Sequence, residues 1–121
     1  MYRRITTIAL ALLLCNCGIL SSPSRTTKNF FYALEGGNLD QAMKLVSTKA
    51  KGGMGEDKLR GMLGEATRKI KQRGGIDSID ITKEEVTGEI ADVTGTIKYK
   101  DGTSENIKQK LVKEDGDWKL Q

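Results

Sequence analysis

The sequence predicts an α+β domain in which three helices precede a four-stranded antiparallel sheet. Up to Arg73, apolar residues recur at the spacing of helices that pack on one side. After Gly75 they alternate with a period of two, and β-branched residues become frequent. Helices grouped before strands, without alternation between the two, are typical of the α+β class.

Helices are expected over about residues 24–35, 39–47 and 56–73. Three Gly-Gly pairs follow these segments, at 36–37, 52–53 and 74–75, where a left-handed residue would end a helix. The segment "STKAKGGMGEDK" between the second and third helices has neither period, so we expect a flexible connection. The packed face of the third helix is predicted to contain Leu59, Met62, Leu63, Ala66 and Ile70.

Strands are expected over about residues 76–86, 89–100 and 103–113, with a last short strand around Trp118 and Leu120. In each strand one face is apolar and the other polar, so one side of the sheet packs and the other meets water. The inner residues of the second and third strands are all odd-numbered. They are Ala91, Val93, Gly95, Ile97 and Tyr99 in the second strand, and Ile107, Gln109 and Leu111 in the third.

The numbering of these inner residues sets the length of the two Asp-Gly turns. Odd-numbered residues face each other only if paired numbers sum to an even value, which requires a three-residue loop at 100–102 with Gly102 left-handed. The inner residues of the last strand are even-numbered. A two-residue loop at 115–116 therefore places Leu111 opposite Leu120 without a bulge.

The composition excludes several classes of function. Hydrophobic residues make up 37% of the chain and charged residues 30%, a balance typical of a soluble globular domain. Histidine is absent, which removes Ser/His/Asp and Cys/His nucleophiles and histidine zinc sites. Without Arg3 and Arg4 the formal charge falls from +4 to +2, too little for a nucleic-acid partner. We predict no metal and no cofactor.

The N-terminal segment has the pattern of an export signal. Arg3 and Arg4 precede an apolar run from residue 5 to 14, which at about 1.5 Å per residue is too short to span a bilayer. A Cys-x-Cys disulfide would be strained, and two thiols alone make a poor metal site. An export signal followed by a cysteine that attaches the protein to the membrane is therefore the preferred interpretation.

The residues Leu14-Cys15-Asn16-Cys17 resemble the lipobox of bacterial lipoproteins, with Cys17 as the lipid acceptor. Asn16 departs from the small residue that this family prefers. Cys15 fits worse as acceptor, because Leu14 would then occupy that small-residue position. The predicted organisation is a signal peptide at 1–16, a lipidated cysteine and tether at 17–23, and an α+β domain at 24–121.

The remainder resembles the nuclear-transport-factor-2-like superfamily, which includes ketosteroid isomerase and SnoaL-like proteins. The matching stretches are "SPSRTTKNFFYALEGGNLDQAMKLVS" and "DGTSENIKQKLVKEDGDWKLQ". More narrowly, they are similar to small lipoproteins of its lumazine-binding-like branch of unknown function. The resemblance implies a cone, in which a curved sheet wraps around the first helix and encloses a pocket.

Two outcomes are open for this pocket. Ala91 and Gly95 are small enough to leave room for a ligand, whereas close packing favours a filled interior. Gln109, an amide on an apolar face, must find a hydrogen-bond partner. The residues expected to line the pocket are Phe30, Phe31, Leu34, Val93, Ile97, Tyr99, Ile107, Gln109, Leu111 and Trp118.

These features predict a lipid-anchored, non-enzymatic protein of the bacterial cell envelope, facing the periplasm or the exterior. It is expected to bind a small apolar ligand or a protein partner. An enzyme that uses the cone pocket is one alternative, although an inward-facing acid or base is lacking apart from Tyr99 and Glu105 near the hairpin end. A homodimer formed through the outer face of the sheet is the other.

Overall fold

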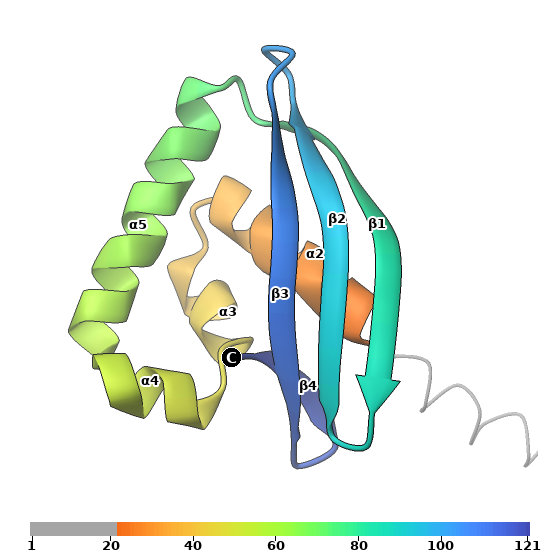
Figure 1. Ribbon diagram of the computed structural model, residues 1–121. Helices are drawn as coiled ribbons and strands as arrows, with labels where there is room; N and C mark the ends of the chain where they lie inside the picture. Colours follow the sequence, from red (N-terminus) through yellow and green to blue (C-terminus); the bar gives the residue numbers. More distant parts are fainter. Residues whose placement is uncertain (1–21) are drawn as a thin grey trace, which may run out of the picture.

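A computed structural model describes residues 22–121 as four helices followed by one antiparallel sheet with the strand order β1-β2-β3-β4 (Figure 1). The α+β class is confirmed, but the expected number of three helices is wrong. The elements are α2 (Pro23–Glu35), α3 (Leu39–Lys44), α4 (Thr48–Met54), α5 (Glu56–Gln72), β1 (Ile76–Thr87), β2 (Ile90–Tyr99), β3 (Ser104–Glu114) and β4 (Asp117–Leu120). Within residues 22–121, none of the helices combines the length and the apolar character that a bilayer span requires.

The additional helix is α4, which occupies the segment expected to be a flexible connection. Gly52 and Gly53 lie inside it rather than after it, and Gly55, with φ of 93°, ends it. Each internal glycine costs about 1 kcal/mol relative to alanine, so the helix needs support from elsewhere. Ser47 Oγ accepts a hydrogen bond from Ala50 N at 3.1 Å, which caps the first turn.

A second contact to α4 comes from the far end of the sheet. The Glu114 carboxylate accepts hydrogen bonds from Thr48 N at 3.0 Å and from Thr48 Oγ1 at 3.2 Å. A carboxylate at the N-terminus of a helix also interacts favourably with the helix dipole. Since Glu114 lies 66 residues from Thr48 in the chain, no local sequence pattern could have revealed this support.

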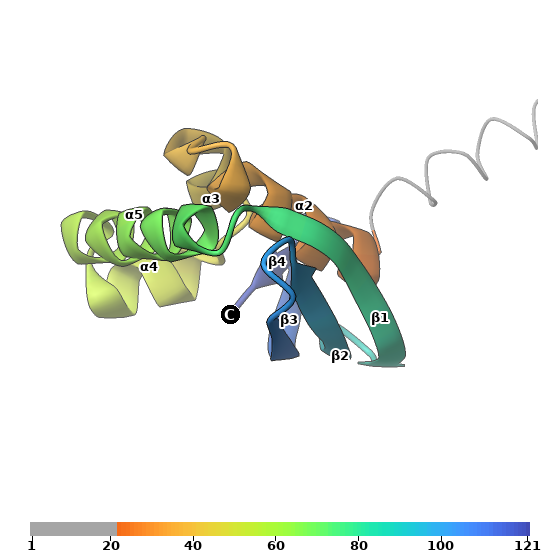
Figure 2. The same ribbon diagram turned by 90° about the horizontal axis from the view of Figure 1, so that it is seen from above.

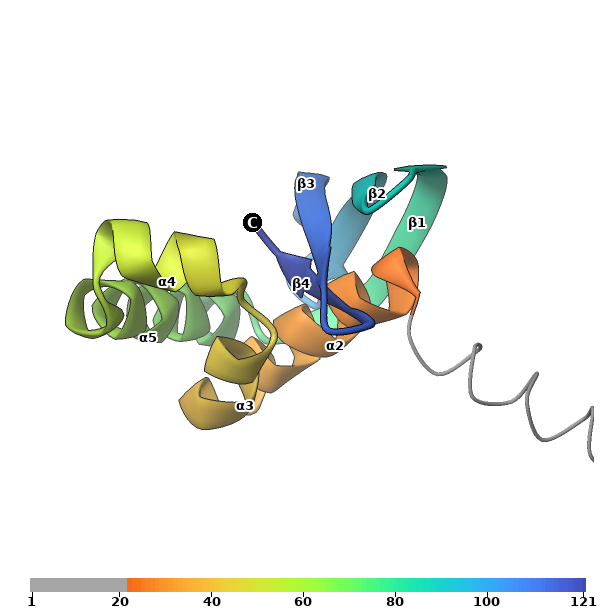
Figure 3. The ribbon, with the colours of Figure 1, turned by 90° about the horizontal axis from the view of Figure 1, so that it is seen from below.

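Helix α2 lies against the inner face of the sheet, whereas α4 and α5 lie to one side of it (Figures 2 and 3). Ser22 caps α2, accepting a hydrogen bond from Arg25 N, and Pro23 suits the first turn because its missing N–H needs no partner there. Phe30 and Leu34 are buried against the strands. At its C-terminal end, Glu35 Oε2 accepts a hydrogen bond from Ile76 N at 2.6 Å, which fixes the start of β1.

Both predicted turns, and the register that follows from them, are confirmed. Lys98 pairs with Ser104, which leaves a loop with Gly102 at φ of 91°. Leu111 pairs with Leu120 across a two-residue turn whose central residues both have positive φ. Positive φ at both positions matches the right-handed twist of the flanking strands.

The end of β4 is joined to the connection between α3 and α4. Helix α3 ends at Lys44, three residues earlier than expected, because the chain turns there to form an isolated parallel bridge between Val46 and Leu120. Leu120 N donates to Leu45 O, and Ser47 N donates to Leu120 O, each at 2.7 Å. The last strand therefore holds the segment from which α4 begins.

The curvature of β1 removes the space expected beside Gly95. Strand β1 carries two register shifts, and the second, between Ile81 and Lys83, bends it over β2. A Cβ atom added at Gly95 would lie 2.3 Å from Asp80 O and 3.0 Å from Ile81 Cα. Ala91 is completely buried. Of the two open outcomes, the surroundings of Ala91 and Gly95 therefore agree with a filled interior, because the β1 backbone fills the space at Gly95.

Candidate binding groove

Two open hollows lie beside α5, and Met62 lines both of them. We call them the hairpin hollow, near the β2–β3 turn, and the α4 hollow, near Met54. Their volumes are about 360 Å³ and about 300 Å³. Pockets of this order of size can bury a small organic ligand. Together the two hollows form what we call the α5 groove.

The groove exists because the apolar stripe of α5 is wider than the surface that the other helices cover. Leu59, Leu63 and Ile70 are buried, since α5 packs on α2, α3 and α4. Met62 was expected to pack with them but is 51% exposed. The side of α5 that carries Met62 and Ala66 faces the groove, so the expected burial of Met62 is wrong.

The floor of the hairpin hollow is apolar. Phe31 and Leu34 reach it from α2, and Ala66 and Ile70 reach it from α5. Phe31 also meets Phe30 edge to face, with ring centroids 5.5 Å apart, which fixes the orientation of both rings. These side chains come from two helices that pack on each other, so the floor is a rigid part of the fold.

Tyr99 and Glu105 form a polar cluster with Arg73 at the hairpin end of this hollow. Tyr99 Oη donates a hydrogen bond to Glu105 Oε1 at 3.0 Å, and the Arg73 guanidinium carbon lies 4.8 Å from the centroid of the Tyr99 ring. Tyr99 is only 6% exposed, so its side chain is buried although it lies near the hairpin end of the sheet. Burial, followed by the hydrogen bond to Glu105, raises the pKa of Tyr99 to about 12. At neutral pH the phenol is therefore a hydrogen-bond donor and not a base.

The α4 hollow has a different chemical character, because no ionisable side chain lines it and its polar lining comes from Gln109 and Gln121. Phe30, Leu63 and Leu120 form part of its wall, and Met54 is exposed at its edge. The polar side chain of Gln109 reaches this hollow, and its Nε2 donates to Lys110 O at 2.9 Å and to Gln121 O at 3.3 Å. The expectation that this amide finds a partner is confirmed.

The ten side chains expected to line a pocket are divided between the groove and the core. Phe31, Leu34 and Tyr99 line the hairpin hollow, whereas Phe30 and Gln109 line the α4 hollow. The structure does not bring all ten around one cavity. The five others are buried among neighbours: Val93, Ile97, Ile107, Leu111 and Trp118.

Sequence reasoning missed the wall that α5 contributes. Met62, Ala66, Lys69 and Arg73 line the hairpin hollow, and the first two were assigned only to helix packing. The usable signal was the width of the stripe, because Met62 extends it beyond the narrow band that one packed neighbour covers. Lys69 and Arg73 carry no such signal, since charged residues on a helix are usually solvated.

Comparison with known proteins places the chain in a family. Residues 15–121 match the family model DUF4878, described as a domain of unknown function. The chain belongs to the DUF4878 family. No curated protein matches it.

A solved structure shows the fold of this DUF4878 protein. The crystal structure of a protein from Campylobacter jejuni, provisionally named an NTF2-like transpeptidase, is similar with a TM-score of 0.73 and 21% sequence identity. The similarity covers 83% of this chain and 97% of that one. The expected nuclear-transport-factor-2-like fold is therefore confirmed. At this level of identity, the comparison extends to the fold and not to the activity.

The residue types that line the groove of the DUF4878 protein limit the chemistry that it offers. Across residues 22–121, no serine, threonine, cysteine or histidine lines either hollow. These are common nucleophiles of covalent group transfer, which pairs them with a base; lysine, tyrosine and carboxylate side chains can also form covalent intermediates, and the hairpin hollow contains all three types. The same described residues contain no group of three His, Cys, Asp or Glu side chains arranged to hold a metal ion. The arrangement offers apolar contact along most of its length and polar contact at the hairpin end.

Proposed function

We propose that this DUF4878 protein is a lipid-anchored protein of the cell envelope that binds a small apolar ligand in the α5 groove without transforming it. The observation that carries the proposal is the exposed apolar wall at Met62. Large apolar side chains are normally covered, and an exposed group of them in a concave surface is typical of a ligand site. Gln109 and the Tyr99–Glu105 pair supply the few polar groups that orient a ligand in such sites.

Among residues 22–121, the lining of the groove contains no serine, threonine, cysteine or histidine, which supports a binding role over the enzyme alternative. The Tyr99 phenol holds its proton at neutral pH, and Glu105 is already engaged as its acceptor. The name of the Campylobacter protein concerns that protein. Transfer of its activity to this chain would need a reacting group in the groove, and we assign none.

Attachment to the membrane belongs to the same proposal and rests on the sequence at Cys17, which lies outside the described residues. Helix α2 begins at Pro23, so a lipid on Cys17 would be separated from the domain by only a short tether. Several acyl chains, each contributing about 0.8 kcal/mol per buried CH₂, make such attachment stable. Membership of the lumazine-binding-like lipoprotein branch is part of this proposal.

Fluorescence of the neutral apolar dye N-phenyl-1-naphthylamine tests binding in the groove. We expect enhanced emission with the purified protein and at least about a tenfold loss of affinity in Met62→Glu, because a methionine contact with a ligand contributes about 1.5–3 kcal/mol. Val86→Glu is the matched control, since Val86 is also 51% exposed but lies at the far end of β1. Equal loss in both variants, or no enhancement with the wild type, contradicts ligand binding in the groove.

The anchor has a separate test in the native host. Metabolic labelling with a fatty-acid analogue should be lost in Cys17→Ala and retained in Cys15→Ala. The opposite result would assign the lipid to Cys15, and an unlabelled wild type would argue against a lipoprotein.

A further inference from the structure

The two hollows of the α5 groove differ in charge, and this difference restricts the kind of ligand that fits. The α4 hollow contains no ionisable side chain, whereas Glu65, Lys69, Arg73 and Glu105 line the hairpin hollow. A ligand that occupies both hollows must therefore be apolar at one end and polar at the other. A uniformly apolar molecule would leave the charged end unused.

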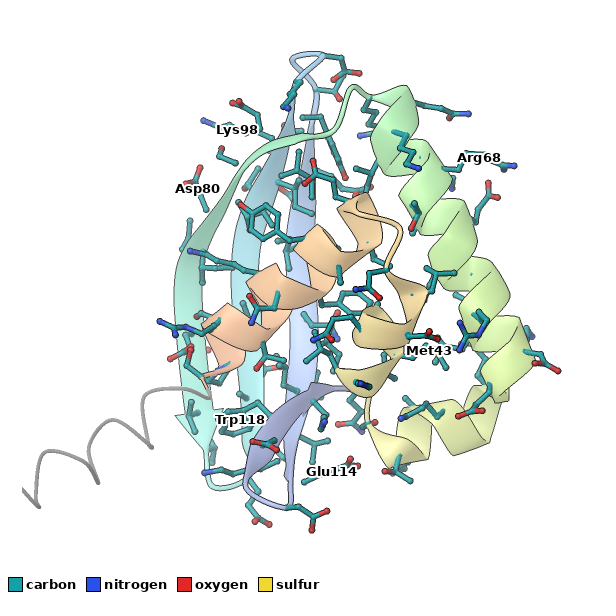
Figure 4. The ribbon with its side chains drawn as sticks, turned by 180° about the vertical axis from the view of Figure 1, so that it is seen from behind. Met43, Arg68, Asp80, Lys98, Glu114 and Trp118 are labelled. Carbon is teal, nitrogen blue, oxygen red and sulfur yellow. The ribbon has the colours of Figure 1, made fainter. Side chains whose placement is uncertain are left out.

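The two carboxylates of the hairpin hollow already have partners within the protein. Glu65 forms an ion pair with Arg68, which lies on the side of α5 that faces away from the sheet (Figure 4). Glu105 accepts the hydrogen bond of Tyr99. Arg68 therefore balances the charge of Glu65, whereas Glu105 keeps its negative charge because its partner is a neutral phenol, so Lys69 and Arg73 outnumber the one carboxylate without a cationic partner.

The two cations are in a different situation. Lys69 and Arg73 form no ion pair with any residue between 22 and 121. Lys69 lies in the last turn of α5 and Arg73 is the residue that caps the C-terminal end of this helix, and both line the hairpin hollow. Arg73 is also held in place by the Tyr99 ring, and its charge interacts with the exposed Asp101 carboxylate. The polar end of the groove thus offers two neighbouring positive charges to a ligand.

The length of the groove agrees with a single chain. Leu59 lines the α4 hollow and Arg73 lines the hairpin hollow, and the rise of a helix over the residues between them is about 21 Å. Met62 lies between these ends and belongs to both hollows. A narrow, extended molecule can pass this point, whereas a wide ring system would occupy one hollow only.

We propose that the ligand of the α5 groove is a single-chain amphiphile with an anionic head, whose head lies against Lys69 and Arg73 and whose hydrocarbon chain runs past Met62 into the α4 hollow. This inference rests on the proposed binding function and adds to it the chemical class of the ligand. The complementary feature is the pair of cations, neither of which forms an ion pair within the described part of the chain, at one end of a groove whose other end contains no ionisable side chain.

The test uses cis-parinaric acid, a polyene fatty acid whose fluorescence rises in apolar sites, and its methyl ester as a neutral probe of the same chain. With the purified full chain we expect the acid to bind about three- to tenfold more tightly than the ester, since each partly exposed charge pair contributes up to about 1 kcal/mol. The variant Lys69→Gln/Arg73→Gln should lose this preference. Arg73→Lys, which keeps the charge, and Lys71→Gln, an exposed lysine that lines neither hollow, should retain it.

The possible results separate this inference from the function on which it rests. Equal binding of acid and ester, lost for both in Met62→Glu, would overturn the anionic head and leave the apolar site standing. A preference for the acid that survives in Lys69→Gln/Arg73→Gln would overturn the assigned position of the head. If neither probe binds, both the ligand class and the binding function are wrong.

Discussion

Replacing Gly95 with alanine would place a methyl group in space that the backbone of β1 already occupies. The added Cβ would lie 2.3 Å from the carbonyl oxygen of Asp80, 3.0 Å from Ile81 Cα and 3.2 Å from the carbonyl carbon of Asp80. All three atoms belong to the backbone, so no side chain can rotate away. The neighbouring strand would have to move by about an ångström at its bulge, with partial loss of the pairing between Ile81 and Gly95.

The expected cost follows from two opposing terms. Overpacking of this kind typically destabilises a protein by about 1–3 kcal/mol, and a rigid neighbour favours the upper end of the range. Alanine recovers about 0.5–1 kcal/mol relative to glycine, because the unfolded chain has less freedom. We therefore expect Gly95→Ala to lower the free energy of unfolding by about 2 kcal/mol. For a domain of this size the melting temperature should fall by about 8–16 °C.

Urea unfolding, followed by the fluorescence of Trp118, measures this change directly, since Trp118 is buried and is the single tryptophan of the chain. Gly53→Ala is the matched control. Gly53 lies inside α4 with no atom within 4 Å of an added Cβ, so this variant should be more stable by up to about 1 kcal/mol. A Gly95→Ala protein as stable as the wild type would refute the close approach of β1 to β2.

Two further predictions concern the groove and its support. The pKa of Tyr99 is raised from 10 to about 12 in the folded protein, so its contribution to stability is complete below pH 10 and is lost as the pH rises toward 12. Absorbance of tyrosinate at 295 nm should show that Tyr99 ionises at this high pH, and Glu105→Gln should shift the ionisation to lower pH. An unchanged titration would contradict the hydrogen bond between the two side chains. Ser47→Ala removes the side-chain cap of α4 and should lower the free energy of unfolding, measured with urea, by about 1 kcal/mol. Binding of N-phenyl-1-naphthylamine should also weaken, because α4 lines one hollow. A variant with wild-type stability would show that α4 does not depend on its cap.

The sheet could be predicted from the sequence in detail because its determinants are local. The inward-facing residues Tyr99, Ile107 and Leu111 are all odd-numbered, so the alternation fixes which face of each strand is buried. Only the length of the connecting turn, two or three residues, then remains to be decided. The pairing of Leu111 with Leu120 and the left-handed Gly102 followed from this argument alone. Two-residue periodicity is a strong constraint, since a shift of one position exposes an entire apolar face.

Helix α4 could not be predicted because its support comes from distant residues. The local sequence around Gly52 and Gly53 disfavours a helix, and that preference is real. It is outweighed by the carboxylate of Glu114, which caps the first turn from the end of β3, and by packing on α5. Tertiary contacts of this kind have no signature in a window of neighbouring residues.

The groove was predicted only in part, for a related reason. The apolar face of α2 was identified correctly, and Phe30, Phe31 and Leu34 do reach the groove. Helical periodicity shows which residues of α5 are apolar, but it does not show which neighbour covers them. Whether Met62 is packed or left open depends on the angle between α5 and the sheet, and the sequence pattern contains no measure of that angle.

The bridge between Val46 and Leu120 has a consequence for the order in which the protein is assembled. It closes a loop of more than seventy residues, which makes it one of the most entropically costly contacts in the chain. During synthesis the helices leave the ribosome first, and the wall that contains Leu120 is translated after them. Until then the apolar residues of α4 and α5 have no strand beside them. The α4 hollow is thus complete only once β4 has docked, and a ligand that enters it would select chains in which β4 has already docked.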